Sequence, residues 1–481
     1  MPNLNDYLAL DATAMAAGLR DGEFKASELV SLAVQQAHRV NPTINAINVE
    51  CYDEALALAA DLDESPARLT GEVAGVPFLI KDLSLLKGHV ATHGSCLYQD
   101  AIATRSANIV ARYLDAGLVI LGKTNTPEFG LTLTTEPVAN GATRNPWNLD
   151  YSTGGSSGGA AAAVAAGIVP VAHATDGGGS IRIPASCCGL FGLKPSRGLT
   201  TIESDIGDSW SGMSVCHVVS RTVRDSAMFL NLITLDEARL YPMPAVPRSF
   251  NENLDAVPKG LRIAVQNQHP FGETLNPDVI EAVEKAAQLC ESLGHHVELV
   301  QHPANYKAAA EAMNKLVCIH TFQGVNRRLQ EVDIELDAAD VENSTRQMAK
   351  MGAKFSAVDY LRARDTLTRL ERRMALFHQD YDVLLSPVLT KTTAKLGWLD
   401  MNTDDLIEYG ARFRAYGGFT ALYNGTGQPS ASLPLFQDSA GLPVGIMATA
   451  AWGNDRLLLQ LSAQLEQAAP WPQIAPFADK D

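Results

Sequence analysis

The chain has 481 residues, of which 38 are basic and 54 acidic, so its formal net charge at pH 7 is −16. This acidic balance argues against nucleic acid or an anionic membrane surface as a partner. Apolar residues make up 46% of the chain and charged residues 19%, which excludes a disordered protein and indicates an ordinary globular interior. The length fits about three domains of ~150 residues, or one large α/β unit with insertions.

The N-terminus and the cysteines indicate the compartment. Residues 1–7 contain neither a basic segment nor an apolar one, so they do not resemble a secretory signal. The longest uncharged stretch, residues 152–175, is too rich in small residues for a membrane span. The sequence therefore predicts a reduced, cytoplasmic protein. A disulfide framework is not expected, because the cysteines are odd in number and form no CxxC pair; they are Cys51, Cys96, Cys187, Cys188, Cys216, Cys290 and Cys318.

In the first half of the chain, the apolar pattern alternates between helical and extended segments. Residues 8–19 and 26–39 are expected to form helices, and Ser27 could cap the second one. The pattern further predicts strands at residues 44–49, 75–80, 118–121 and 168–172, and helices at residues 108–116, 159–166 and 222–235.

The second half follows residues 241–258, which contain four prolines and are expected to form a crossing between larger parts. Alternating strands and helices predict α/β layers around a mixed or largely parallel sheet. We expect a single domain, with an N-terminal helical segment at 1–70, a catalytic core at 71–240, and a part at 259–481 that completes the sheet and the substrate pocket. The pattern predicts strands at 261–265, 296–300, 383–385, 430–433 and 444–450, and helices at 277–293, 306–329, 356–378 and 455–466.

Residues 117–124 match the GxxxxGK[ST] pattern of a phosphate-binding loop. The four spacer residues are Leu, Val, Ile and Leu, which indicate a buried strand and not a loop that wraps phosphates with backbone amides. Pro127 follows closely and disfavours helical geometry at Thr126. The sequence therefore favours a strand and a turn here over nucleotide binding.

Two serines lie in glycine-rich segments between apolar elements. Ser156 belongs to residues 152–159, whose composition alone would also suit a flexible linker. Its place directly before an alanine-rich buried helix favours a functional loop instead. Ser180 follows three glycines, whose N–H groups could converge on one point as an oxyanion hole requires. Ser180 is therefore a candidate nucleophile, with a serine-capped glycine turn as the alternative.

A serine nucleophile needs a base, and the sequence offers two kinds. His89, His93 and His173 leave a Ser-His-Asp triad open, although no GxSxG turn surrounds either serine. Lys81 ends the apolar run 76–80, where burial would lower the pKa of its amine and let it accept a proton. The alternative for Lys81 is an ordinary lysine at a strand edge, with its amine in solvent.

These segments together resemble the amidase signature family. The Ser156–Ser180 separation of 24 residues is that of the family's two serines. The resemblance covers most of the chain and implies an amidase with the family's α/β fold, in which helices cover both faces of one large mixed sheet. The matching motifs follow the family's order and spacing, and they are residues 75–82, 122–129, 154–159, 178–182, 189–195, 425–434 and 441–445.

The resemblance implies a Ser-Ser-Lys triad. Ser180 would be the acylated nucleophile, Ser156 a bridging serine that follows a cis peptide bond, and Lys81 the neutral base behind it. Such an enzyme would hydrolyse amides through an acyl-enzyme on Ser180.

The resemblance also implies how the loop around the nucleophile works. Asp176 and Arg182 would pair and hold this loop. The family usually has a larger residue where this chain has Gly177, so we expect a slightly looser loop and a wider pocket. The oxyanion hole would consist of the backbone N–H groups of Gly177, Gly178, Gly179 and Ser180.

Residues 134–137, 141–148 and 171–173 resemble a branch of the family that hydrolyses the cyclic dimer of 6-aminohexanoate. Linear or cyclic small amides are therefore the expected substrates. Cys318, on the helix predicted at 306–329, falls near the position where this branch has a cysteine beside its lactam, whereas the simpler interpretation is a buried helix cysteine.

One other function remains as an alternative, the glutaminase-type subunit of a tRNA amidotransferase, which shares this triad but works in a complex. The sequence shows no metal-ligand spacing such as HExxH, so we expect neither a metal nor another cofactor. The expected partner is a small-molecule amide, without nucleic acid or membrane, and a homodimer is left open.

Overall fold

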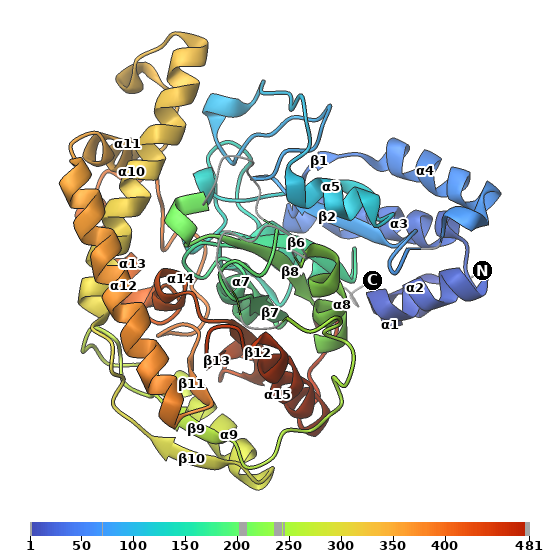
Figure 1. Cartoon of the computed structure of the whole chain (residues 1–481). Helices are drawn as coiled ribbons and strands as arrows, with labels where there is room; N and C mark the ends of the chain where they lie inside the picture. Colours follow the sequence, from blue (N-terminus) through green and yellow to red (C-terminus); the bar gives the residue numbers. More distant parts are fainter. Residues whose placement is uncertain (1, 70, 202–208, 235–242, 244–245, 477–481) are drawn as a thin grey trace.

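An eight-stranded mixed sheet lies at the centre of the protein (Figure 1). The computed structural model describes residues 2–69, 71–201, 209–234, 243 and 246–476. The strand order is β10-β9-β11-β13-β12-β7-β8-β6; β9 runs parallel to both of its neighbours, and the other neighbours pair antiparallel. These strands are β6 (Val171–Asp176), β7 (Phe191–Lys194), β8 (Val215–Ser220), β9 (Arg262–Val265), β10 (His296–Leu299), β11 (Val383–Pro387), β12 (Ser430–Gln437) and β13 (Pro443–Ala450).

A smaller sheet of three strands, in the order β1-β3-β2, meets the large sheet at its edge strand β6. Strand β2 (Pro77–Lys81) is parallel to β3 (Val119–Thr124), and β1 (Ile47–Glu50) is antiparallel to β3. The backbone N–H of Lys81 donates to Nδ1 of His173 on β6 over 3.4 Å. The end of β2 therefore lies beside β6. A two-stranded sheet, β4 (Arg144–Asn145) and β5 (Asn148–Ser152), precedes the first serine loop.

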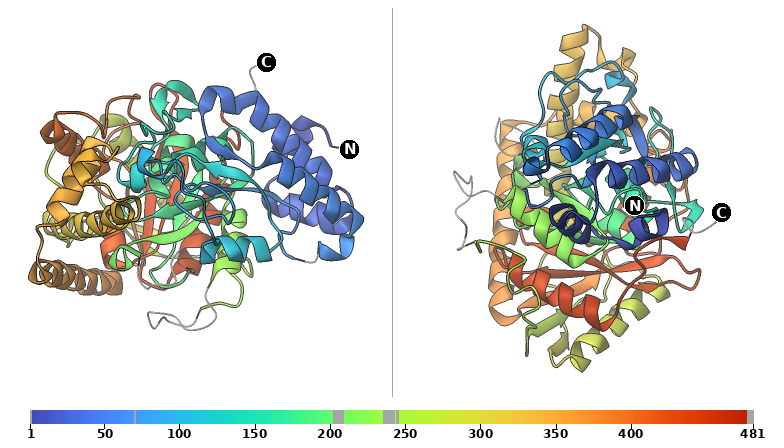
Figure 2. Two further views of the ribbon diagram at one scale, coloured as in Figure 1. Left: turned by 90° about the horizontal axis from the view of Figure 1, so that it is seen from above. Right: turned by 90° about the vertical axis from the view of Figure 1, so that its right-hand side faces the viewer.

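Helices cover both faces of the large sheet, as the sequence predicts. Helices α10 and α12 lie together on one side of the molecule, and α1 to α4 lie on the opposite side (Figures 1 and 2). The helices are α1 (Leu4–Ala9), α2 (Ala12–Asp21), α3 (Ala26–Ile44), α4 (Tyr52–Glu64), α5 (Asn108–Asp115), α6 (Gly158–Ala165), α7 (Arg182–Cys188), α8 (Val223–Ile233), α9 (Pro277–Ser292), α10 (Tyr306–Val332), α11 (Asn343–Gly352), α12 (Ala357–Asp380), α13 (Leu406–Gly417), α14 (Leu422–Thr426) and α15 (Asp455–Ala468).

Alternation along the strands explains how the two faces are covered. Successive side chains of a strand point to opposite faces. On β13, Ile446 and Ala448 pack in the cluster that contains residues of α9 and α15, whereas a Cβ on Gly445, which points to the opposite face, would lie 2.5 Å from Ser186 Oγ of α7. Helix α7, which follows the second serine loop, thus lies on the face away from α9 and α15.

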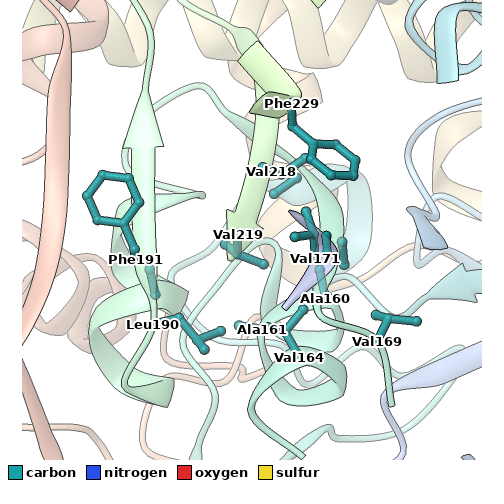
Figure 3. Packing of buried hydrophobic residues seen from close by; sticks show 14 of the residues in the cluster. Ala160, Ala161, Val164, Val169, Val171, Leu190, Phe191, Val218, Val219 and Phe229 are labelled. Atoms are coloured by element: carbon teal, nitrogen blue, oxygen red, sulfur yellow. The ribbon is translucent and has the colours of Figure 1, made fainter. Parts of the chain in front are cut away.

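The alanine-rich helix α6 is buried in the centre (Figure 3). Ala160, Ala161 and Val164 belong to the same cluster as Val171 of β6 and Val218 of β8. A Cβ on Gly159 would lie 2.5 Å from the backbone nitrogen of Asn125, just beyond β3, so only glycine allows the helix to approach the small sheet this closely. The glycine-rich segment before α6 is therefore part of the core and not a linker.

Two sequence predictions near the N-terminus are wrong in detail. The helix expected at 8–19 is broken into α1 and α2, because the side chain of Asp11 accepts from the Ala14 N–H and caps a new helix. Ser27 does not cap α3, whose N-cap residue is Lys25. The Ser27 hydroxyl instead donates to Asp63.

The proline-rich crossing lies partly outside the described residues, at 241, 242, 244 and 245. Its remaining residues up to 258 form no helix or strand, yet Phe250 is buried in the main cluster and its N–H donates to the Asn231 side chain over 2.8 Å. This part of the crossing is thus packed against the core. Across the described ranges, no helix is both long and apolar enough to cross a bilayer.

Candidate active site

The amine of Lys81 lies at the junction of the two sheets, at the end of β2. Its side chain is fully buried, and Nζ lies 2.7 Å from Ser156 Oγ, 2.9 Å from Ser157 Oγ and 3.0 Å from Thr175 Oγ1. A lysine at a solvent-exposed strand edge is thereby excluded. Ser157 and Thr175 hold the amine beside Ser156, and the sequence did not single out either of them for this contact.

The loop that carries Ser156 is locked by its neighbours. The Gly155–Ser156 peptide bond is cis, as the family resemblance implied. A Cβ on Gly155 would lie 2.4 Å from the Thr134 carbonyl oxygen, which explains the glycine. The Ser156 carbonyl accepts from the Thr126 hydroxyl over 2.9 Å. These contacts fix the hydroxyl of Ser156 between Lys81 and the cavity described below.

The second serine loop joins the first through the backbone. The Ser157 N–H donates to the Ser180 carbonyl over 3.3 Å. Ser180 is 9% exposed, and its side chain lines the same cavity as Ser156, Thr175 and Gly178. The structure thus brings together Lys81, Ser156 and Ser180, the three residues that the sequence predicts to form a triad.

Asp176 and Arg182 form a buried ion pair under the Ser180 loop. The guanidinium donates to both carboxylate oxygens of Asp176 over 2.9 Å, and both side chains are fully buried. Burial alone would raise the pKa of Asp176, but Arg182 outweighs it and holds this pKa well below its usual range. The predicted pairing of these two residues is present.

Asn424 completes this support, a role that was not predicted from the sequence. Its side chain accepts from Arg182 over 2.7 Å and donates to the Asp176 backbone carbonyl over 2.8 Å and to the Met213 carbonyl over 3.0 Å. The only available signal was its position just before the matching motif that begins at Gly425. The Asn424 amide therefore ties together three segments that are distant in the sequence, around Asp176, Met213 and Asn424 itself.

The glycine amides do not all face the cavity. The Gly179 N–H donates to Asp176 over 2.7 Å, so this amide is not free to bind an oxyanion, and the expectation for Gly179 is corrected. Within the described part of the chain, no protein group accepts from the N–H of Gly177, Gly178 or Ser180. Gly179 has φ of +135°, and a Cβ there would lie 2.3 Å from Thr420 Oγ1, so glycine is required for the loop's shape.

Gly177 does not widen the pocket as expected. A Cβ at this position would lie 2.9 Å from Cε3 of Trp210, whose indole occupies the space of the missing side chain. Trp210 itself lines the cavity. The small residue and the large one therefore compensate for each other, a pairing that is not visible in the sequence because 33 residues separate them.

A cavity of about 400 Å³ opens onto these groups. Its walls come from the two serine loops, residues 129–133, helix α10 and the end of α13. Most of the lining is apolar or aromatic, with Phe129, Trp210 and Met313 among its residues. Such a site suits a small organic molecule whose reacting group lies at Ser180.

The three histidines left open as bases are not placed for that role. His173 is buried beside Lys81, and burial lowers its pKa to about 3. His93 lines the cavity, and burial lowers its pKa to about 4. His89 contacts Cys51 and Glu54 instead. Among the described residues, no histidine is hydrogen-bonded to Ser180.

Two further predictions concern residues outside the triad. Lys123, from the GxxxxGK[ST] match, is fully buried on β3 and forms an ion pair with Asp82, so it cannot reach a phosphate. Cys318 is fully buried and absent from the cavity lining; its backbone carbonyl packs against Gly352 of α11. The neighbouring Val317 and Thr321 face the cavity instead, so substrate binding by the Cys318 side chain is corrected to a packing role.

One group of side chains outside this site has metal-ligand chemistry, which the sequence did not suggest. Cys51 Sγ lies 3.3 Å from His89 Nδ1, and Glu54 Oε2 lies 3.1 Å from His89 Nε2. Burial, with Glu54 nearby, raises the pKa of the Cys51 thiol to about 11, which disfavours the thiolate that a metal needs. Because the two contacts use different ring nitrogens, they form a hydrogen-bonded chain.

The chain is similar to known proteins over almost its whole length. The family model described as Amidase matches residues 28–459. The 6-aminohexanoate-cyclic-dimer hydrolase of Paenarthrobacter ureafaciens is 34% identical over 481 residues, which cover 97% of this chain and 96% of that protein.

Solved structures agree with this similarity. The structure of 6-aminohexanoate cyclic dimer hydrolase complexed with substrate matches with a TM-score of 0.90 and 33% identity, covering 98% of this chain and 99% of the other. One of the subunits of glutamyl-tRNA(Gln) amidotransferase from Thermotoga maritima matches with a TM-score of 0.74 and 25% identity, covering 99% of this chain and 97% of the other.

Proposed function

The chain belongs to the amidase family and is an amidase, and on this premise we propose that it hydrolyses small carboxylic amides through a Ser-Ser-Lys triad and an acyl-enzyme. The observation that carries the proposal is the 2.7 Å contact between the fully buried amine of Lys81 and Ser156, in the cavity that also contains Ser180. A buried amine is a competent base when its neutral form is favoured, and burial acts in that direction.

The first half of the reaction acylates Ser180. Its Oγ attacks the amide carbonyl carbon, while its proton passes to Ser156 Oγ and the proton of Ser156 passes to Lys81 Nζ. The carbonyl oxygen becomes an oxyanion, which the free N–H groups of Gly177, Gly178 and Ser180 stabilise. The proton then returns by the same path to the amide nitrogen, the C–N bond breaks, and the amine leaves.

The second half releases the acid. A water molecule gives its proton through Ser156 to Lys81 and attacks the ester carbon of acylated Ser180. The bond between this carbon and Oγ breaks, Oγ regains the proton, and the carboxylic acid leaves. Asp176 and Gly179 take no direct part, because the Gly179 N–H and the Arg182 guanidinium are both bound to the Asp176 carboxylate and fix the loop.

The substrate proposal covers linear and cyclic small amides, and 6-aminohexanoate cyclic dimer belongs to the panel because of the relatives reported above. We further propose that the chain acts on such small molecules alone, in the cytoplasm and without nucleic acid, membrane or an amidotransferase partner. The higher TM-score to the cyclic dimer hydrolase than to the amidotransferase structure supports this choice, 0.90 against 0.74.

The test uses the purified chain alone on an anilide, a lactam, a dipeptide amide and glutamine. The proposal predicts hydrolysis of at least one of the first three by the wild-type chain, and none by Ser180→Ala with an unchanged melting temperature. Substantial amidase activity in Ser180→Ala would contradict the triad. Activity only on glutamine, and only with added partner subunits, would favour the amidotransferase alternative.

A further inference from the structure

The cavity extends far to both sides of the nucleophile. Helix α10 lines it from Tyr306 to Arg327, and at about 1.5 Å rise per residue this stretch is about 31 Å long. Trp210, which lies against Gly177 in the Ser180 loop, packs in a cluster with Met313, about a third of the way along this stretch from Tyr306. A substrate with its amide at Ser180 therefore has room for an extension on the acyl side and another on the amine side.

Each end of the cavity combines aromatic side chains with an arginine. At the end near the start of α10, Phe271 and Phe413 pack against the cluster that contains Tyr306, and Arg414 follows Phe413 on α13. At the other end, Tyr98 and Phe129 contribute to a separate cluster with residues of α10, and Arg327 lies on the same helix.

Arg327 and Arg414 differ from the arginines nearest to them in the sequence, which are ion-paired. Arg328 forms ion pairs with Asp100 and Glu331, and Arg412 forms one with Glu408. Over the described residues, neither Arg327 nor Arg414 has a carboxylate partner, and both are exposed where they line the cavity.

The charge of the cavity is opposite to that of the whole chain. The net charge of the chain is −16, yet Arg327 and Arg414 are the only charged side chains among the described residues of the lining. Burial lowers the pKa of the lining residues His93, to about 4, and His320, so both imidazoles are neutral. The cavity therefore presents two guanidinium groups and no counter-charge from this lining, which favours anionic ligands over cationic ones.

We propose that the cavity selects elongated amides that end in a carboxylate, which Arg327 or Arg414 binds according to the side of the scissile bond on which it lies. This inference rests on the amide hydrolysis proposed above and narrows its substrate class. A guanidinium matches a carboxylate with two parallel N–H donors, while the aromatic residues cover the apolar chain between the charge and the amide. An uncharged cyclic amide would use the apolar part of the cavity without either arginine.

The test compares two series of linear amides. In one, the acyl chain ends in a carboxylate; in the other, the amine half does. Each acid is paired with its methyl ester and with an analogue that ends in an ammonium group, and the chain length is graded. The proposal predicts that kcat/KM is about tenfold higher for the acid than for the ester in both series, and lowest for the ammonium analogue. This preference should shrink at high salt, because both arginines are exposed.

Variants assign the preference to single residues. Arg327→Gln should raise KM about tenfold for the acid of one series, Arg414→Gln should do so for the other, and the esters should change little. The adjacent, ion-paired positions provide matched controls, and Arg328→Gln and Arg412→Gln should leave the acid-to-ester ratio unchanged.

The outcomes separate this inference from the function on which it rests. Equal kcat/KM for acids and esters in the wild type, or equal loss for both in Arg327→Gln and Arg414→Gln, would overturn the inference while amide hydrolysis stands. Absence of turnover for every amide in both series and in the neutral panel would overturn the proposed function, and this inference with it.

Discussion

The buried pair of Arg182 and Asp176 allows a quantitative test of how the nucleophile loop is held. In Arg182→Met, the cation that faces both carboxylate oxygens at 2.9 Å is lost, and an apolar side chain of similar length fills the space. The Asp176 carboxylate stays fully buried, with the Gly179 and Ile181 N–H groups and Asn424 as its remaining donors. Breaking a buried pair in this way costs about 3–5 kcal/mol.

This cost converts into a melting temperature. The entropy of unfolding is about 2.1 cal/mol/K per residue, which for 481 residues gives about 1 kcal/mol/K. A loss of about 4 kcal/mol should therefore lower the melting temperature by about 4 °C. The deficit should shrink as the pH falls, because an unpaired Asp176 carboxyl would be protonated at a higher pH than the paired one, whose pKa Arg182 keeps low.

Scanning calorimetry and amide hydrolysis provide the assay. The matched control is Arg262→Met, which removes an arginine that also contacts its aspartate, Asp382, through two nitrogens but is half exposed; we expect little change in melting temperature there. Arg182→Met should also lose most of its kcat, because the loop that carries Ser180 is anchored on Asp176. An Arg182→Met variant as stable and as active as wild type would refute this reasoning.

Three further predictions concern the surroundings of the site. Gly177→Ala should push the indole of Trp210, 2.9 Å from the new Cβ, and lower kcat/KM about 10- to 100-fold, with an altered tryptophan fluorescence; unchanged kinetics would show that the indole does not shape the site. Thr175→Val removes an oxygen 3.0 Å from the Lys81 amine and so disfavours its ammonium form, which should move the acidic limb of the kcat/KM profile to lower pH; an unmoved limb would exclude Lys81 as the titrating base. Burial raises the pKa of Glu342 from 4.5 to about 8, so the folded state keeps a proton that the unfolded state loses, and the stabilisation present below pH 4.5 is lost as the pH rises to 8. Between pH 6 and 8, ionisation of Glu342 should lower the free energy of unfolding of the wild type by about 2 kcal/mol. Glu342→Gln keeps the acceptor for the Val138 N–H but cannot ionise, so it should not show this decrease when measured by chemical denaturation. A pH dependence like that of wild type would contradict the shift.

The sequence predicts local features well where one physical cause dominates. Residues 76–80, directly before Lys81, are all apolar, and the strand β2 that ends at Lys81 is buried at every residue. The alanine-rich segment was expected to form a helix at 159–166, and α6 spans Gly158–Ala165, so each end differs by one residue. The small side chains of this segment suit a buried helix. In both cases the cause lies within a few residues of the pattern itself.

Features that depend on distant partners were missed. Ser27 was expected to cap α3, but its hydroxyl donates a hydrogen bond to Asp63. The space beside Gly177 was expected to be open, but the indole of Trp210 fills it. The commitment of the Gly179 amide to Asp176 follows from the loop's shape, which residue types alone do not specify. Cys318 differs from the cavity residues on either side of it only by the direction in which α10 turns it.

The central claim is that Ser180 carries the acyl group, and trapping that intermediate tests it most directly. A slowly hydrolysed anilide is mixed with the enzyme, the reaction is quenched in acid, and the peptides are mapped by mass spectrometry. The account predicts a mass increase equal to the acyl group on the peptide that contains Ser180, absent in Ser180→Ala and present in a control with Cys318→Ala. An adduct on Ser156 or on a cysteine, or turnover that persists in Ser180→Ala, would contradict it.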